Sequence, residues 1–363
     1  MTKRHMHRKR RKTMEKKKVA IIFGGCSTEY GVSLQSAYSV ITNINKDKYE
    51  TILIAITREG SWYRYNGDTA NILTDLWHTD KEQCIPVVIS SNRNSHHILQ
   101  ISNGTIKETK IDIAFPVLHG KNGEDGTVQG LLELAGIPIV GCGTLASALC
   151  MDKDRAHKLV GLAEIKTPVG VVIDRTLNYD EIMKHTKHLS YPLFVKPIKA
   201  GSSFGITKVY DYKHLPEAVK NAFLHDNQVI IEENIDGFEV GCAVLGNNEL
   251  TIGEVDEIEL TNGFFDFSEK YTLETSKIHV PARITSEAAV RIKEAAATIY
   301  RTLGCTGFAR VDMFLTPNQE IVFNEVNTIP GFTSHSRYPN MMKGIGLQFP
   351  DIVDKLIQLG LNG

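Results

Sequence analysis

The stretch FARVDMFLTPNQEIVFNEVN, residues 308–327, decides the fold of the C-terminal part of this 363-residue chain. Two runs rich in Val, Ile and Phe flank the dipeptide Pro317–Asn318, which is typical of a turn. The pattern therefore predicts a β-hairpin. Side chains alternate between the two faces of each strand, so every second residue of the hairpin shares a face.

The polar residues of this hairpin have the chemistry of a magnesium site. Arg310 and Asp312 are expected on one face of the first strand. On the second strand Glu325 and Asn327 share a face, and the turn brings Asp312 near Glu325. An Asp, a Glu and an Asn supply the hard oxygen ligands that suit Mg²⁺ bound to nucleotide phosphates. The alternative is an ordinary hairpin with solvated acids.

A Gly/Ser loop follows a strand that ends in a lysine. In FVKPIKAGSSFGITKV (194–209), Lys196 precedes a turn whose backbone N–H groups and hydroxyls can hold phosphate oxygens. The spacing is not that of a Walker A loop, and alone it fits a flexible turn equally well. Lys153 is a second candidate for phosphate, or else part of a solvated helix face. Glu239, in IIEENIDGFEV (230–240), could take ribose hydroxyls. With the hairpin, the loop indicates an ATP site.

Two further loops, GGCSTEYGVSL (24–34) and VLHGKNGEDGTVQG (117–130), follow strands in the N-terminal third. Both leave the carboxyl ends of expected parallel strands, where open α/β sheets bind ligands. The first lacks the G-x-G-x-x-G spacing of a dinucleotide site. Its carboxylate, Glu29, is placed to hold an ammonium group. His119, at the second strand end, is either a site residue or a buried structural histidine.

The N-terminal third alternates strands with helices, which predicts an α/β domain with a parallel sheet. The segment 66–110 is polar and weakly patterned, and no element is predicted there. The expected strands are 16–25, 51–57 and 111–120, and the expected helices are 31–43 and 126–136.

The rest of the chain changes toward antiparallel, α+β character. A helix over 147–163 is expected to lead into a strand-rich region. From about residue 233 onward the strands read as antiparallel. The expected strands are 169–173, 192–197, 206–210, 238–246 and 249–260, followed by a long loop at 261–280 and a helix at 286–304.

Composition is that of a globular protein, with 42% hydrophobic and 23% charged residues and no apolar run of membrane-spanning length. The net charge of −1 hides an asymmetry, because residues 1–18 carry 10 of the 41 Lys and Arg with one acid. This tail could touch nucleic acid or anionic lipid, or be a disordered extension upstream of a start at Met14. Six cysteines without paired spacing suggest reduced thiols and a cytoplasmic location.

Together these motifs resemble the ATP-grasp D-alanine–D-alanine ligase family. From about Lys18 onward the chain matches, in order, GG-x-S-x-E, HG-x-x-GEDG-x-x-QG, MDK, VKP-x-x-x-GSS-x-G, EKY, RVD and NEVNT-x-PG-x-TSHS. Such ordered agreement is far more specific than any one motif. The resemblance implies an ATP-grasp fold with an N-terminal Rossmann-like domain, and ATP held between two antiparallel sheets. It also implies two Mg²⁺ ions, which Mn²⁺ can replace.

The implied division has four parts. They are a basic tail (1–17), an N-terminal substrate-binding domain (18–141), a central ATP-grasp subdomain (142–232) and a C-terminal one (233–363) with a lid loop (261–280).

Residue by residue, the resemblance also implies a site. The cofactor-binding residues would be Lys153 and Lys196 on phosphates, Glu239 on the ribose, and Ser203, Glu232 and Asn324. The metal ligands would be Asp312, Glu325 and Asn327. The triad that seals the site would be Glu29, Ser202 and Tyr271, with Lys270 on the transferred phosphate, and Arg310 and the Gly331 N–H as an oxyanion hole. The substrate residues would be His119, Phe265, Ser336 and Arg337.

The residue after TSHS, Arg337, distinguishes second substrates. Family members that add D-alanine commonly have a leucine there, facing a methyl group, whereas a guanidinium would bond the hydroxyl of D-serine. Arg337 and Phe265 thus match the D-alanine–D-serine ligases of vancomycin resistance, most of all their VanG type. The alternative is that Arg337 turns to solvent or pairs with an acid. D-lactate is disfavoured, because Tyr271 stands where lactate ligases have a histidine.

The expected function is an ATP-dependent ligase that joins D-alanine to D-serine through a D-alanyl phosphate. The expected assembly is a cytoplasmic homodimer that binds small molecules and neither membrane nor nucleic acid. Three alternatives stay open: a D-alanine–D-alanine ligase of ordinary cell-wall synthesis, an ATP-grasp ligase for another carboxylate and amine, and a non-catalytic nucleotide-binding regulator.

Overall fold

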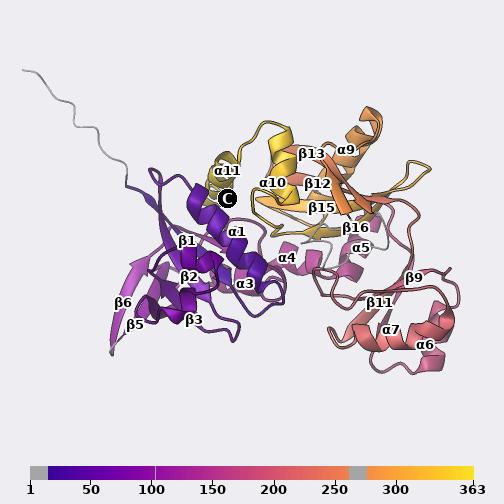
Figure 1. Cartoon of the computed structure of the whole chain (residues 1–363), viewed down its shortest axis with the longest axis horizontal. Helices are drawn as coiled ribbons and strands as arrows, with labels where there is room; N and C mark the ends of the chain where they lie inside the picture. Colours follow the sequence, from indigo (N-terminus) through magenta and orange to yellow (C-terminus); the bar gives the residue numbers. More distant parts are fainter. Residues whose placement is uncertain (1–14, 103, 261–275) are drawn as a thin grey trace, which may run out of the picture.

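The computed structural model describes residues 15–102, 104–260 and 276–363. In these ranges the strands form three sheets, each with its own helices (Figure 1). None of the helices described is long and apolar enough to cross a membrane.

The first sheet is parallel at its centre, as predicted. Strand β1 (Lys17–Gly24) lies between β2 (Tyr49–Ile56) and β7 (Ile113–Val117) and pairs with both in parallel. Residues 19–23 of β1 are buried on both faces, which explains their unbroken apolar run. Helices α1 (Tyr30–Asn43) and α3 (Thr127–Leu134) lie close to their predicted positions.

Residues 62–65 and the segment 66–110, for none of which an element was predicted, extend this sheet on the far side of β2. The pairing there is antiparallel, so the sheet is mixed, with the order β6-β5-β4-β3-β2-β1-β7. Much of this extension is exposed, which removes the hydrophobic periodicity that would have marked the strands. The elements are β3 (Trp62–Tyr65), α2 (Ala70–Leu73), the 3₁₀ turn η1 (Trp77–Thr79), β4 (Cys84–Ile89), β5 (His97–Ser102) and β6 (Thr105–Lys110).

The helix predicted over 147–163 is in fact two helices. Helix α4 (Thr144–Met151) ends before Asp152, and α5 (Lys153–Leu162) begins after it. Asp152 has extended backbone angles, and its carboxylate accepts the N–H of Arg155 as the N-cap of α5. The break sets Lys153 at the first position of the new helix.

The second sheet is antiparallel and lies beside α6 and α7 (Figure 1). Its order is β10-β9-β11-β8, and one face packs on both helices in a single apolar core. The elements are β8 (Gly170–Asp174), α6 (Tyr179–Thr186), β9 (Leu193–Pro197), β10 (Thr207–Val209), η2 (Tyr212–His214), α7 (Leu215–Ala222) and β11 (Gln228–Glu233).

The third sheet contains the predicted hairpin. Its order is β14-β13-β12-β15-β16, all antiparallel, and the hairpin strands are β15 (Phe308–Leu315) and β16 (Ile321–Asn327). Helix α9 (Ser286–Thr302) packs on this sheet, as does α10 (Arg337–Gly344). Helix α11 (Phe349–Leu361) returns to pack beside α1 and β7 of the first sheet (Figure 1). The other strands are β12 (Phe238–Gly246), β13 (Leu250–Leu260) and β14 (Ser276–His279).

The predicted lid loop, 261–280, overlaps a strand at its C-terminal end. Residues 276–279 form β14, which pairs with β13. Residues 261–275 lie outside the described part of the chain, and with them Phe265, Lys270 and Tyr271.

Candidate active site

A cavity of about 550 Å³ lies between the second and third sheets. It is the cleft in which the sequence predicted a nucleotide. Every residue predicted to bind the cofactor lines it, together with one predicted metal ligand: Lys153, Lys196, Ser203, Glu232, Glu239, Asn324 and Glu325.

Glu232 is at the centre of what we call the nucleotide cluster, formed by Lys196, Glu232 and His157. Its carboxylate is fully buried and lies 2.7 Å from Lys196 Nζ and 3.1 Å from His157 Nδ1. Burial alone would raise the pKa of Glu232, but the Lys196 ammonium and His157 hold it well below the ordinary value. Nε2 of His157 lies 2.9 Å from the Asn324 carbonyl on the third sheet, so the cluster links both walls of the cleft.

Lys153 enters the cleft from the break between α4 and α5. It is buried, donates to the Ala200 carbonyl at 2.9 Å and lies 3.5 Å from the Glu325 carboxylate. The bond to Ala200 ties the lysine to the start of the Gly/Ser loop. Both predicted phosphate lysines therefore line the same cavity as residues of that loop.

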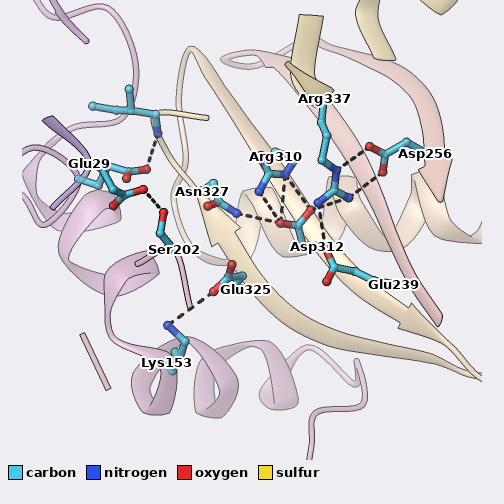
Figure 2. A network of polar contacts seen from close by, with 12 residues as sticks. Glu29, Lys153, Ser202, Glu239, Asp256, Arg310, Asp312, Glu325, Asn327 and Arg337 are labelled. Atoms are coloured by element: carbon cyan, nitrogen blue, oxygen red, sulfur yellow. Dashed lines mark hydrogen bonds and ion pairs between the residues drawn. The ribbon is translucent and has the colours of Figure 1, made fainter. Parts of the chain in front are cut away.

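Glu29 and Ser202 meet although 173 residues separate them (Figure 2). The Ser202 hydroxyl donates to the Glu29 carboxylate, which is buried. Two glycines make room for this carboxylate: a Cβ at Gly120 would lie 2.5 Å from Oε2, and one at Gly201 would lie 2.8 Å from it. Two members of the predicted triad are thus in contact. The third, Tyr271, lies outside the described residues.

The hairpin has the predicted register, with Asp312 opposite Glu325 and Arg310 opposite Asn327. Arg310 donates to both Asp312 oxygens, at 2.8 and 3.0 Å, and Asn327 Nδ2 donates to Oδ2 at 2.9 Å. No group of three or more His, Cys, Asp or Glu side chains arranged for a metal occurs in the described ranges. Two carboxylates and an amide oxygen nevertheless fit Mg²⁺, which takes one or two carboxylates and completes its shell with phosphates and water.

Arg337 is buried, and its guanidinium pairs with acids rather than facing solvent (Figure 2). It binds Asp256 as a fork, with Nε to Oδ2 and Nη2 to Oδ1 both at 2.7 Å. Nη1 donates to Glu239 at 2.9 Å, and Nη2 lies 3.3 Å from Asp312. We call Arg310, Asp312, Arg337 and Asp256 the arginine cluster.

The arginine cluster packs over Gly241 of β12, which has no side chain to occupy that space. This residue is opposite Asp256 on one neighbouring strand and Asp312 on the other. A Cβ at Gly241 would lie 2.3 Å from Arg337 Nη2 and 2.6 Å from Asp256 Oδ1. Burial would lower the pKa of Arg337, but Asp256, Asp312 and Glu239 more than offset this and raise it.

The remaining predicted residues lie close to this cluster. Ser336 precedes α10, and its hydroxyl accepts the Thr333 N–H at 3.1 Å. Gly331 packs near Ser336, with 3.2 Å between a Cβ placed there and the hydroxyl. His119 has both ring nitrogens occupied by protein atoms, Nδ1 by the Ile329 carbonyl at 2.8 Å and Nε2 by Ser36 Oγ at 3.0 Å. These bonds favour a positioning role for His119 over direct contact with a substrate.

Sequence reasoning missed Asp256, His157 and Gly241. Asp256 is in the acidic run GEVDEIEL, where alternation marks it as inward-facing but nothing marks its partner. His157 follows Lys153 by four residues on the same helix face, a spacing that could have pointed to the cleft.

Two antiparallel sheets that close over a cavity with two lysines and facing carboxylates define an ATP-grasp enzyme. Family models confirm this class, since "D-ala D-ala ligase N-terminus" matches residues 18–142 and "D-ala D-ala ligase C-terminus" matches residues 160–358.

The similar proteins point the same way. The VanG D-Ala:D-Ser ligase from Enterococcus faecalis has a solved structure that is 61% identical, with a TM-score of 0.89, over 95% of this chain and 100% of that one. The vancomycin/teicoplanin A-type resistance protein VanA of Enterococcus faecium is 45% identical over 96% of this chain and 100% of its own length. A D-alanine–D-alanine ligase of Caldicellulosiruptor bescii is 43% identical, and the match covers 96% of each. The chain therefore belongs to the D-alanine–D-alanine ligase family of ATP-dependent ligases.

Proposed function

We propose that this ligase joins D-alanine to D-serine, with ATP consumed through a D-alanyl phosphate. Its product, D-Ala–D-Ser, would enter peptidoglycan precursors in vancomycin resistance. The solved structure at 61% identity belongs to a D-Ala:D-Ser ligase, which supports the choice of D-serine.

The observation that carries the proposal is the Arg337 fork on Asp256. A guanidinium has five N–H donors, and its hydrogen bonds to Asp256 and Glu239 use three of them. Asp312 faces a fourth. One N–H on Nη1 has no acceptor among the residues that the structure describes, and it can take a substrate hydroxyl. D-Alanine lacks this hydroxyl, so it would leave the donor unpaired.

The charge balance of the arginine cluster also suits D-serine. Two arginines face three acids, Asp256, Asp312 and Glu239, so there is no excess positive charge to attract an anionic side chain. Because acids already balance the charge of Arg337 and fix its position, its guanidinium would distinguish second substrates by the direction of a hydrogen bond. This is the recognition that a neutral hydroxyl requires.

The first step would use the nucleotide cleft and the Glu29 region. Glu29 would hold the ammonium of D-alanine, while Lys153 and Lys196 bind phosphate oxygens around the transferred group. Asp312, Glu325 and Asn327 would hold two Mg²⁺ ions, which neutralise phosphate charge when bound. The carboxylate of D-alanine would attack the γ-phosphorus of ATP, and ADP would leave. The amine of D-serine, after losing a proton, would then attack the acyl carbon of the D-alanyl phosphate, and inorganic phosphate would leave. Arg310 and the N–H of Gly331 would stabilise the oxyanion.

Ordinary D-alanine–D-alanine ligation is the second candidate, and the 43% identical ligase of Caldicellulosiruptor bescii favours it. A regulator without catalysis is disfavoured, because lysines, carboxylates and Gly/Ser loop line one cavity. We place the ligase in the cytoplasm as a homodimer. All six cysteines are free thiols, which supports a reducing compartment, and the dimer follows from the family resemblance.

A competition assay tests the proposal. The protein receives Mg-ATP with D-alanine and D-serine at equal concentrations, and mass spectrometry identifies the dipeptides. We expect mostly D-Ala–D-Ser. Mostly D-Ala–D-Ala would keep the enzyme class and overturn the choice of D-serine. If neither dipeptide forms while ATP still binds, both ligase assignments fail for these substrates.

A further inference from the structure

The segment Thr328–Phe332 connects the β15–β16 hairpin, which contains the predicted metal ligands and which we call the metal-type hairpin, to the turn before Arg337. It contains Gly331, whose N–H is the proposed oxyanion donor. Glycine has the most backbone freedom of any residue, so its N–H points in a fixed direction only if its neighbours are held. Side chains from the N-terminal part of the chain form hydrogen bonds with the backbone of residues on both sides of Gly331.

Three side chains bind the backbone of this segment. The N–H of Ile329 donates to Glu124 Oε1 at 3.0 Å. The carbonyl of Ile329 accepts from His119 Nδ1 at 2.8 Å. On the other side of Gly331, the N–H of Phe332 donates to Ser36 Oγ at 3.2 Å. Both Ile329 and Phe332 are buried, so water does not compete for these bonds.

The hydrogen-bond directions in this group are mutually consistent. A bond to the Ile329 carbonyl requires the proton of His119 on Nδ1, which leaves Nε2 as an acceptor. Nε2 lies 3.0 Å from Ser36 Oγ, so the serine donates to the histidine and accepts from Phe332. Burial lowers the pKa of His119, which favours this neutral form.

Glu124 also connects the segment to the Glu29 region. Its second oxygen, Oε2, accepts the N–H of Gly120 at 2.8 Å, and Gly120 borders the Glu29 carboxylate. A single carboxyl group therefore links the predicted ammonium site to the predicted oxyanion site, although 205 residues separate Glu124 from Ile329. Burial and the nearby Glu29 raise the pKa of Glu124 to about 8.

We propose that Glu124, with Ser36 and His119, is a positioning residue that directs the Gly331 N–H toward the oxyanion of the tetrahedral intermediate. The proposal rests on the proposed function. Its physical basis is that a donor aimed at developing charge acts without reorganisation, and that a misplacement of about 1 Å can cost on the order of 10²-fold in rate.

Glu124→Gln tests the proposal with little change of shape. A glutamine amide can accept one N–H but not two, because its NH₂ group is a donor. We expect kcat to fall by about 10- to 100-fold, and the KM for ATP to stay within about twofold. Affinity for a phosphinate dipeptide analogue, which is tetrahedral like the intermediate, should fall by about the same factor as kcat/KM.

Asp125→Asn is the matched control. Asp125 is the next residue, and its carboxylate also accepts two backbone N–H groups, but both belong to its own loop, at Asn122 and Thr127. The Asp125→Asn variant should bind the phosphinate analogue with wild-type affinity. A loss of affinity as large as that of Glu124→Gln would show a general effect of the loop and overturn the proposal.

Ser36→Ala provides a second readout if Glu124→Gln does not fold. It removes the bond to Phe332 and should weaken phosphinate binding while ATP still binds. Wild-type affinity for the analogue in a folded variant of either residue would overturn the positioning role, with the proposed function intact. A wild-type protein that forms no dipeptide would instead contradict the proposed function.

Discussion

The nucleotide cluster and the arginine cluster are both buried, but they balance charge differently. In the first, the single carboxylate of Glu232 lies between two nitrogen groups, Lys196 Nζ and His157 Nδ1. In the second, two guanidinium groups alternate with two aspartates across three adjacent strands and α10. The first arrangement suits phosphates, and the second suits a neutral group.

This difference separates two tasks within one site. Under the proposed function, Lys153 and Lys196 would exchange contacts with their carboxylate partners for ATP phosphates and stabilise the charge of phosphoryl transfer. The guanidinium of Arg337, fixed by Asp256, would select between second substrates by one hydrogen bond. Substitutions in the nucleotide cleft should therefore lower the formation of D-Ala–D-Ser and D-Ala–D-Ala together. Substitutions in the arginine cluster should instead change the ratio of the two products.

The largest expected effect comes from the metal-type hairpin. Glu325→Gln should lower formation of D-Ala–D-Ser and D-Ala–D-Ala alike, by about 10²–10³-fold, because a ligand of the ions that neutralise phosphate charge is lost. Phosphate release measures the loss. Glu320→Gln is the control, since this acid of the same hairpin is exposed and pairs with Lys166. Full turnover in Glu325→Gln would refute the metal assignment.

A methyl group at Gly241 should change the dipeptide ratio more than the rate. In Gly241→Ala the Cβ would overlap Arg337 Nη2 and the Asp256 carboxylate, so the guanidinium must shift. We expect the preference for D-serine over D-alanine to fall by about tenfold, with a stability cost of about 1–3 kcal/mol.

Gly161→Ala is the control for this variant, because a Cβ there meets nothing within 4 Å. Competition assays on both variants give the ratio. A Gly241→Ala protein with the wild-type ratio would show that the position of the guanidinium does not matter.

The smallest expected effect is on stability at acid pH. The folded protein holds the pKa of Glu232 below its ordinary value of 4.5, so this carboxylate stabilises the fold above that pH and loses its contribution as the pH falls. One such proton corresponds to a slope of about 1.4 kcal/mol per pH unit.

Glu232→Gln should be less stable at neutral pH, because Lys196 loses its charged partner, but its stability should depend less on pH on the acid side. Urea unfolding between about pH 6 and pH 3.5 measures the two slopes. Equal slopes in both proteins would contradict the charge assignment of the nucleotide cluster.

Much of the fold followed from sequence periodicity, as in the buried run of β1 and the alternation of the hairpin. The antiparallel extension β3 to β6 did not, because exposed residues such as Ile106 and Lys107 give no two-sided pattern. The break at Asp152 was missed as well. Helical periodicity continues across it, and only the capping geometry shows that a new helix begins.

The placement of candidate site residues was predictable where a motif gives residue types at fixed spacing, as for Asp312 opposite Glu325. The partners of Arg337 were not. Asp256 is 81 positions away, and no local pattern connects it to an arginine after a Ser-His-Ser turn. Of the alternatives for Arg337, pairing with an acid is what the structure shows, and exposure to solvent is excluded. That pairing fixes the guanidinium, and under the proposed function its remaining Nη1 N–H would bond the substrate hydroxyl.

The most direct test of this division of tasks is the dipeptide ratio of Arg337→Leu, measured with total phosphate release. Arg337→Lys, which keeps the charge but cannot form the fork on Asp256, is assayed alongside, and nucleotide binding verifies that each variant is folded. We predict that Arg337→Leu continues to hydrolyse ATP with D-alanine present and changes from D-Ala–D-Ser to D-Ala–D-Ala as its main product. A folded Arg337→Leu protein with the wild-type ratio would contradict the account.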